Sequence, residues 1–160
     1  MDIHLMVMTK ELCRIYMGGF IPDPDLFADP AAYQPYVYTQ DSCDAYFERH
    51  RNLGRIHLAV MLQDEPIGEV VLKKIDHTGK HCTMGISMQS DAFKNRGFGT
   101  QAEILALEYA FQKLGLETVY ADALLNNHRS QHVLAKAGFR ETHRDDAFVY
   151  YRCDQADWHK

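Results

Sequence analysis

KNRGFGT, at residues 94–100, lies where a strand-like run has ended and a helix-like run begins. The amides of a helix's first turn and the helix dipole attract anions, and Gly97 and Gly99 leave room for a pyrophosphate to approach the backbone. Lys94 and Arg96 add positive charge. The pattern is neither a P-loop nor the glycine fingerprint of a dinucleotide-binding fold. It predicts a phosphate-binding turn, with a plain helix start as the other interpretation.

The segments on either side of this turn have different periodicities. After the turn, apolar residues cover most sides of Gly99 to Leu114, which predicts a largely buried helix that Gly115 ends. Before the turn, three apolar runs follow one another closely: Ile56–Leu62, Ile67–Ile75 and Cys82–Met88. The connections at 64–66 and 77–80 are short, so these runs predict an antiparallel meander.

The remaining elements complete a single α/β domain over residues 1–160. Before the meander we expect a strand at Ile3–Val7, a helix at Glu11–Met17 and a helix from Asp41 or Ser42 to about Leu53. After the buried helix we expect a strand at Thr118–Ala123, a helix at Asn127–Ala137, and strands at Phe139–His143 and Phe148–Cys153. This order predicts a mixed, mostly antiparallel sheet with helices on both faces. Residues 18–38 contain four prolines and predict a long loop.

The composition narrows the class of protein and its partners. A chain of 160 residues with 46% apolar and 24% charged residues is typical of one globular domain. The net charge of −5 argues against nucleic acid as the main partner, because that affinity comes from clustered basic residues. The four cysteines are widely spaced, so we expect reduced thiols in a cytoplasmic protein. No apolar run approaches the roughly 18 residues that would span a membrane.

A second pattern begins at Asn127 and ends at Phe139. Asn127 could cap a helix that Gly138 ends, and this interpretation accounts for every residue without a function. The two patterns together, in this order and about thirty residues apart, resemble the GNAT superfamily of acetyl-CoA-dependent N-acetyltransferases. Residues 94–99 match its Q/R-x-x-G-x-G/A pattern with lysine in the first position. Asn127 and Ser130 match N-x-x-S, and residues 136–139 match K-x-G-F.

The resemblance implies a GNAT fold with acetyl-CoA as co-substrate. The pantetheine arm is expected to run as an added strand along residues 84–88, at the backbone of Ile86 and Met88. The backbone amides there would polarise the thioester carbonyl. The residues expected to hold the pyrophosphate are Lys94, Asn95, Arg96, Gly97, Phe98, Gly99 and Thr100. Asn127 is expected to hold the coenzyme arm or a bound water, and Ser130 is a further candidate for binding the coenzyme.

The acceptor amine must lose a proton before it attacks, since an alkyl ammonium has a pKa near ~10.4. The resemblance points to Asp122, five residues before Asn127, as a proton acceptor; a solvated strand-end aspartate is the other interpretation. Glu69, within an otherwise apolar strand, is the second candidate base if its side chain points inward. Leu134 occupies the position where many relatives carry a tyrosine acid, so Ser130 is the candidate proton donor to the leaving thiolate.

Several alternatives stay open. The stretch Phe148–Tyr151 with Trp158 resembles the branch that modifies ribosomal-protein N-termini, so the acceptor is an amine of a small molecule or of a peptide N-terminus. A silent coenzyme-A sensor and an interaction domain on the same fold are the rival functions. The histidine pairs 128/132 and 77/81 have zinc-like spacing but no third ligand, and we expect no metal. The protein is expected to be a monomer or a homodimer.

Overall fold

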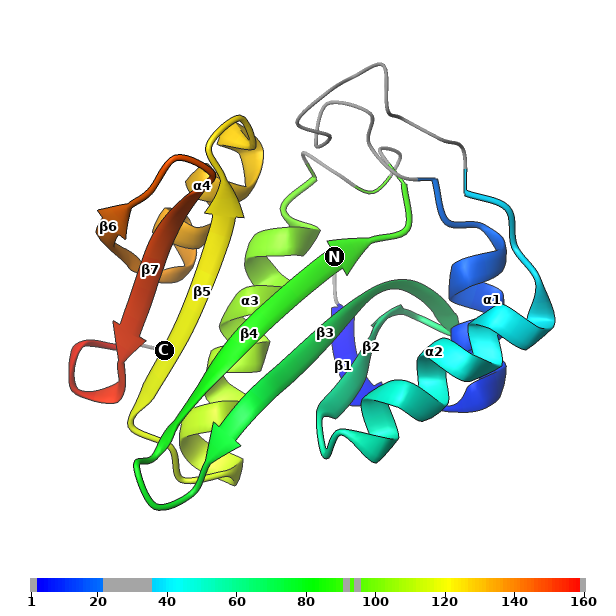
Figure 1. Cartoon of the computed structure of the whole chain (residues 1–160), viewed down its shortest axis with the longest axis horizontal. Coiled ribbons are helices and arrows are strands. Elements are labelled where there is room, and N and C mark those ends of the chain that lie inside the picture. The colour runs from blue at the N-terminus through cyan, green and yellow to red at the C-terminus, as the bar shows by residue number, and fades with distance from the viewer. Residues whose placement is uncertain (1–2, 22–35, 91–92, 94–95, 159–160) are drawn as a thin grey trace.

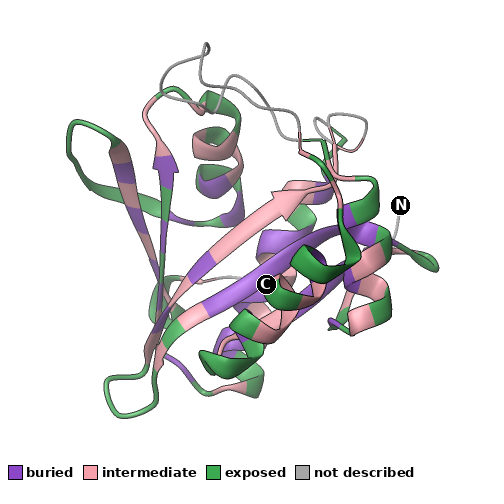
Figure 2. Ribbon diagram, turned by 45° about the vertical axis from the view of Figure 1, so that its right-hand side comes forward, coloured by how far each residue is buried: buried purple, intermediate pink, exposed green. Residues whose placement is uncertain are grey.

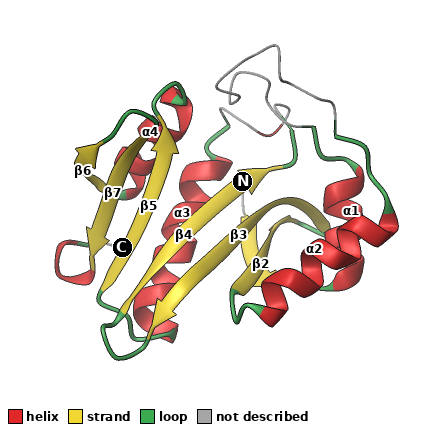
Figure 3. Cartoon of the chain, in the orientation of Figure 1, coloured by secondary structure: helices red, strands yellow, loops and turns green. Residues whose placement is uncertain are grey.

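A computed structural model describes residues 3–21, 36–90, 93 and 96–158. The strands are β1 (Ile3–Val7), β2 (Ile56–Leu62), β3 (Glu65–Asp76), β4 (His81–Met88), β5 (Thr118–Leu124), β6 (Arg140–Arg144) and β7 (Phe148–Asp154). The helices are α1 (Lys10–Gly18), α2 (Gln40–Asn52), α3 (Phe98–Glu108) and α4 (His128–Ala137). Figures 1 and 3 show these elements in space. The predicted order of elements is confirmed.

The seven strands form one sheet in the order β1-β2-β3-β4-β5-β7-β6. Every neighbouring pair is antiparallel except β4 and β5, which are parallel. α1 and α2 pack on one face, where Cys13, Tyr16 and Cys43 meet Ala59 and Met61. α3 and α4 cover the other face, and their apolar residues share a core with β2 to β5 and β7. The α/β fold with a mixed sheet between two helical layers is therefore confirmed.

β3, the third of the seven strands, is buried on both faces. Residues 66–72 are all buried, and Figure 2 shows this stretch as a continuous purple band. β5 and β7 instead alternate, with one face in the core and one facing out. Each fully buried aliphatic side chain, such as Leu72 or Val70, stabilises the fold by roughly 1.5–3 kcal/mol.

α3 begins one residue earlier than the periodicity indicates, at Phe98. Gly97 has a φ of +82°, a left-handed conformation that glycine adopts without steric cost, and this sets the sharp entry into the helix. Phe98 is completely buried and anchors the first turn. The helix continues as a π-helical turn over Tyr109–Lys113, and Gly115 follows with a φ of +70°.

β4 and β5 are paired only where they begin. His81, Cys82 and Thr83 lie opposite Thr118, Val119 and Tyr120, and the register goes no further. Beyond Thr83, β4 is paired only with β3 and β5 only with β7 among the strands described. Figure 1 shows the two strands diverging from this shared end, with α3 behind them. One edge of β4 therefore carries backbone groups that no strand pairs.

Two local predictions were wrong in detail. α2 is capped by Thr39, whose hydroxyl accepts a hydrogen bond from the Ser42 amide at 3.2 Å, and not by Asp41 or Ser42. Glu65 and Pro66 belong to β3, although the sequence places them in the preceding turn. A register shift between Val60 and Met61 lies next to Pro66, which is where a sheet tolerates a residue without an amide hydrogen.

Candidate functional site

The N-terminus of α3 presents backbone amides that the helix itself does not use. The first helical hydrogen bond runs from the Gln101 amide to the Gly97 carbonyl at 3.1 Å, so the amides before it precede the helical ladder. Gly97 makes no side-chain cap. Among the described residues, a Cβ on Gly97 would meet nothing within 4 Å, and one on Gly99 would meet Val133 of α4 at 3.6 Å. The backbone of this turn is therefore open to a ligand.

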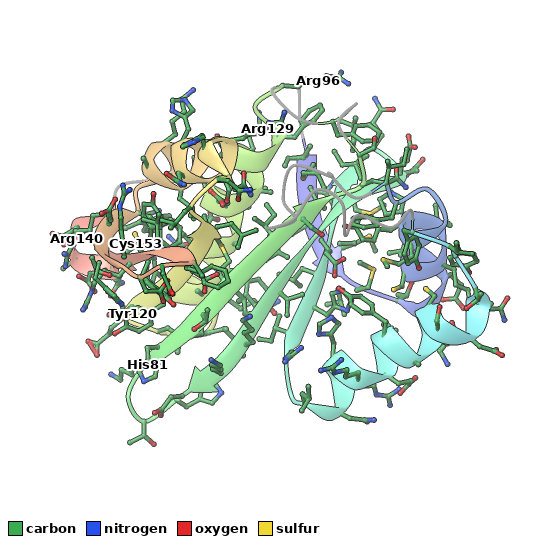
Figure 4. All side chains as sticks on the ribbon, turned by 45° about the horizontal axis from the view of Figure 1, so that its top comes forward. His81, Arg96, Tyr120, Arg129, Arg140 and Cys153 are labelled. Carbon is green, nitrogen blue, oxygen red and sulfur yellow. The ribbon has the colours of Figure 1, made fainter. Side chains whose placement is uncertain are left out.

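Two arginines lie near this turn. The Arg96 guanidinium carbon lies 4.9 Å from the centroid of the Phe98 ring, and the side chain is exposed. Arg129 is exposed in the first turn of α4. Figure 4 shows both arginines at the same end of the molecule, away from His81 and Tyr120 at the paired end of β4 and β5. This end therefore combines two helix N-termini with two positive charges.

The start of α4 is held by its own cap. The Asn127 side-chain oxygen accepts a hydrogen bond from the Ser130 amide at 3.0 Å, and Gly138 ends the helix with a φ of +114°. This is the structural interpretation that the sequence left open. The Asn127 oxygen is committed to the cap, while its amide group and the Ser130 hydroxyl are separate hydrogen-bonding groups.

The unpaired edge of β4 would present main-chain groups, and not side chains, to a ligand. Ile86 and Met88 pack their side chains against the core on the α3 side of the sheet. The alternation of a strand then turns Thr83, Gly85 and Ser87 to the opposite face, toward α1 and α2. A ligand along this edge would meet the main chain of residues 84–88, as the resemblance implies.

Glu69 points inward, and it is the centre of a buried polar cluster under α1 and α2. Its side chain is 6% exposed. The Tyr46 hydroxyl donates to Glu69 Oε1 at 2.6 Å, and His57 Nε2 lies 2.9 Å from the same oxygen. Burial and the neighbouring Glu69 charge raise the pKa of Tyr46, which keeps this phenol a hydrogen-bond donor. Two donors thus converge on one carboxylate oxygen.

A tyrosine–serine pair lies beside this carboxylate. The Tyr16 hydroxyl of α1 is 2.6 Å from Ser87 Oγ of β4, and Ser87 lies directly opposite Glu69 in the β3–β4 register. Burial raises the pKa of Tyr16 well above its ordinary value. The charge of Glu69 acts in the same direction. The Tyr16–Ser87 pair therefore lies on the same face of the sheet as Glu69, next to it across the two strands.

His50 and His57 extend the cluster toward the end of α2. Their ring centroids lie 4.6 Å apart, and desolvation, followed by the nearby His57, lowers the pKa of His50 to about 4. Nitrogen and oxygen ligand atoms of His50, His57 and Glu69 lie within 4.8 Å of one another. Arg55 lies 3.1 Å from His50 Nδ1, and an arginine can only donate, so His50 carries its proton on Nε2. That tautomer cannot bind a metal through Nε2.

Asp122 lies on β5, opposite Tyr150 of β7, and is exposed. Its neighbours Ala121 and Ala123 face the α3 core, so Asp122 points to the same side of the sheet as Ser87. The two side chains stand on strands that diverge. The structure therefore does not bring Asp122 into the hydrogen-bonded cluster of Glu69.

Residues 19–140 match the family described as acetyltransferase (GNAT) domain. The chain belongs to this family. A related sequence is the spermidine N(1)-acetyltransferase of Escherichia coli K12, which is 26% identical over 106 residues, 66% of this chain and 56% of the relative. The match thus spans little more than half the length of that protein.

Two solved GNAT-type structures share the fold. AAC(6')-Ib in complex with ribostamycin and coenzyme A has a TM-score of 0.80 at 14% identity, covering 98% of this chain and 96% of that one. Spermidine N-acetyltransferase from Vibrio cholerae in complex with coenzyme A and spermine has a TM-score of 0.71 at 16% identity, covering 97% and 96%. None of these similar proteins is named as a ribosomal-protein acetyltransferase, and that branch stays a prediction.

The GNAT motifs point to only part of the candidate site, and the role of each of its residues stays a prediction. Gly97, Phe98, Gly99, Thr100 and Arg96 gather at the α3 N-terminus, whereas Lys94 and Asn95 lie outside the described residues. Sequence reasoning missed Tyr16, Tyr46, His57 and Ser87. The alternation of β4 could have placed Ser87 on the face of Glu69, but only with the β3–β4 register in hand. No local signal connects Tyr16 to either residue.

No helix in the described ranges is both long and apolar enough to cross a bilayer. All four cysteines are buried free thiols, and Cys13 and Cys43 are in contact with their sulfurs 3.7 Å apart. Burial, the first cause, raises the pKa of both thiols, which disfavours the reactive thiolate. These cysteines are packing residues and not candidate nucleophiles.

Proposed function

We propose that this protein transfers the acetyl group of acetyl-CoA to a primary amine of a small molecule. The observation that carries the proposal is the divergence of β4 and β5 beside the open N-terminus of α3. An extended ligand can pair with the unpaired edge of β4 while its phosphates meet the helix N-terminus. The family of the chain and the coenzyme A in two similar structures support this use of the site.

The residues that would hold the coenzyme come from three elements. Phosphates would meet Arg96 and the amides of Phe98, Gly99 and Thr100, together with the sequence-predicted Lys94 and Asn95. The pantetheine arm would pair with the backbone at Ile86 and Met88. Arg129, at the start of α4, adds a second arginine for the phosphates, and the Asn127 amide group could bind the arm. The thioester supplies an activated acetyl group, which the β4 amides would polarise.

Glu69 is the proton acceptor that the geometry favours. It lies on the α1–α2 face of the sheet, opposite Ser87 on the diverging half of β4. Two donors hold one of its oxygens, so the carboxylate is kept in one orientation. Asp122 remains the second candidate from the motif, and Ser130 the candidate donor to the leaving thiolate, since its hydroxyl stands one helical turn from Asn127.

The acceptor class follows from charge and from the relatives. The net charge of −5 suits a cationic acceptor, and the similar proteins are named for spermidine and for an aminoglycoside, which are small molecules rich in amines. A polyamine is therefore our first acceptor to test, and an N-terminal peptide is the comparison. Both would bring a protonated amine that must be deprotonated before attack.

Acetyl-CoA binding by calorimetry, followed by release of free thiol in the presence of spermidine, an aminoglycoside or N-terminal peptides, tests the proposal. We expect coenzyme binding and thiol release that depends on a small amine. Release with peptides alone would overturn the small-molecule acceptor. If acetyl-CoA binds but no acceptor causes release of free thiol, a silent coenzyme-A sensor would be favoured. If acetyl-CoA does not bind, the glycine turn would have only a structural role.

A further inference from the structure

We propose that Tyr46 and His57 are positioning residues for the base: they occupy Oε1 of Glu69 and leave Oε2 as the atom that takes the proton of the acceptor ammonium. This inference rests on the proposed function, in which Glu69 is the favoured proton acceptor. It goes further by assigning the reacting oxygen and the two side chains that select it. Both residues act through Glu69 and not on the acceptor itself.

Oε1 of Glu69 is fully used by hydrogen bonds. The Tyr46 hydroxyl donates to it at 2.6 Å, and His57 Nε2 lies 2.9 Å from it. A distance of about 2.5–2.7 Å is typical of an O–H donor and an ionised oxygen, which indicates a carboxylate. A carboxylate only accepts, so His57 carries its proton on Nε2 and donates as well. One carboxylate oxygen offers about two lone pairs, and the two donors take both.

Oε2 is the oxygen that stays available. Both hydrogen bonds that join Glu69 to other side chains of the described chain end on Oε1. Over the described ranges, the fully buried side-chain atoms without a partner include His57 Nδ1 and His50 Nε2 but not Glu69 Oε2. Oε2 therefore keeps some contact with solvent, although the residue as a whole is 5% exposed. A charged oxygen in such a place is stabilised by a donor, which an ammonium or a water can supply.

The two donors hold the carboxylate from the side away from the proposed coenzyme site. His57 is on β2, and Tyr46 is on α2, which packs on β2. In the sheet, β2 and β4 lie on opposite sides of β3, and Glu69 is paired with Ser87 on the β4 side. The thioester is expected along the unpaired edge of β4. Glu69 is thus held from the β2 side, and the reaction centre would lie on the other.

Packing fixes the Tyr46 ring, which a positioning residue requires. The ring meets those of His50 and His57 edge-on, with centroids 4.4 and 5.9 Å apart and interplanar angles of 87° and 80°. Two residues earlier on α2, Asp44 accepts two hydrogen bonds from Arg14 of α1, at 3.0 and 2.7 Å. Because α2 is joined to α1 in this way, the hydroxyl of Tyr46 is delivered to Glu69 from a fixed helix.

The other titratable groups nearby do not replace Glu69 as the base. Those that face it come from α1, α2 and β2, and from the segment that joins α2 to β2: Cys13, Tyr16, Cys43, Tyr46, His50, His57 and Arg55. Burial raises the pKa of both tyrosines and both thiols, so these groups keep their protons near neutral pH. Desolvation lowers the pKa of His50 to about 4, so that ring is neutral as well. Glu69 is the one carboxylate of this group.

The proposed step moves one proton. An N–H bond of the ammonium breaks as its proton bonds to Oε2 of Glu69, in direct contact or through one water. The bonding pair stays on nitrogen, which becomes a neutral amine able to attack the thioester carbonyl, and the carboxylate becomes a carboxylic acid. Tyr46 and His57 keep their own protons, and the total charge does not change.

The pH profile of kcat/KM tests the two donors. Removing a hydrogen bond to an ionised carboxylate favours its protonated form. We expect the acid limb of the profile to move to higher pH by about 1–2 units in Tyr46→Phe and in His57→Leu, the size of a hydrogen bond to a charged group. His57→Gln keeps an N–H donor and should leave the limb near its wild-type place. Tyr109→Phe, which loses a phenol hydroxyl in the turn after α3, is the matched control and should not move it.

The position of the acid limb separates this role from a structural one. A structural loss would lower activity at every pH, so an unmoved limb in Tyr46→Phe would overturn the inference while leaving the acetyltransferase proposal intact. Tyr46→Phe alone decides this if the Tm shows that His57→Leu does not fold. A limb that moves as far in His57→Gln as in His57→Leu would overturn the role of His57 as donor. A wild-type protein that binds acetyl-CoA but acetylates no amine would contradict the proposed function, and the inference with it.

Discussion

At the scale of single residues, Glu69 carries the largest functional expectation. Glu69→Gln keeps an oxygen that can accept from Tyr46 and His57 but removes the base. We expect kcat to fall by roughly 10²–10⁴-fold with acetyl-CoA affinity unchanged, because the coenzyme residues lie on other elements. Steady-state kinetics and calorimetry on the same preparation check this. Asp122→Asn is the matched comparison, and an equal loss there would assign the base to Asp122.

A second residue, Glu103 of α3, affects stability rather than chemistry. It is 1% exposed, and both carboxylate oxygens lack a hydrogen-bond partner within the described part of the chain. Burial raises its pKa from 4.5 to about 8. The folded state therefore binds more protons than the unfolded state between these values, and stability falls as pH rises through that window.

Glu103→Gln removes this titration. Between pH 4.5 and 8 the free energy of unfolding of wild type should decrease, relative to that of the variant, by on the order of a few kcal/mol. The stabilisation by protonated Glu103 should be complete below pH 4.5 and lost by pH 8. Urea unfolding at four pH values measures it. Since every other group is shared, the wild-type-minus-variant difference isolates Glu103, and a difference that stays flat with pH would refute its burial as an acid.

At the scale of elements, the entry into α3 links backbone conformation to ligand binding. Gly97 has a φ of +82°, and a side chain there is strained even though its Cβ would meet no atom of the described residues within 4 Å. We expect Gly97→Ala to cost roughly 1–2 kcal/mol of stability and to weaken acetyl-CoA binding by shifting the first-turn amides. Thermal unfolding and calorimetry check the two effects. Gly18→Ala, where φ is not left-handed and the space is also open, is the control and should leave coenzyme affinity unchanged.

At the scale of the whole molecule, the coenzyme should join the two halves of the sheet. β4 and β5 share only three paired positions, so little strand pairing joins the two halves of the sheet. β5, α4, β6 and β7, which follow α3, lie together in the second half. A ligand that bridges β4, α3 and α4 binds the folded state alone, so acetyl-CoA at 100 times its Kd should add about 2.7 kcal/mol to the free energy of unfolding. A Tm that does not respond to saturating coenzyme, measured beside Arg96→Ala, would contradict this site.

The sequence predicted most strands closely because their apolar residues stand in short runs, continuous in β3 and alternating in β5 and β7. β1 and β2 have the predicted bounds, and β4 begins one residue before its predicted start. Glycines at 97 and 138 mark real helix ends, since both adopt left-handed conformations that other residues avoid. The cap of α2 at Thr39 and the place of Pro66 within β3 were predicted wrongly. Caps and bulges depend on neighbouring residues that local periodicity does not include.

What the sequence alone determined is the family, the order of elements and the glycine turn, because these reside in contiguous residues with their own local geometry. What only the tertiary structure decided is the polar cluster around Glu69. Tyr16 and Ser87 are 71 residues apart, Tyr46 and Glu69 are 23 apart, and His57 and Glu69 are 12 apart. A shift of one residue in the β3–β4 register would turn Ser87 to the other face. The contact exists because strand register and helix packing fix it, and neither can be derived from the local pattern around any of these residues.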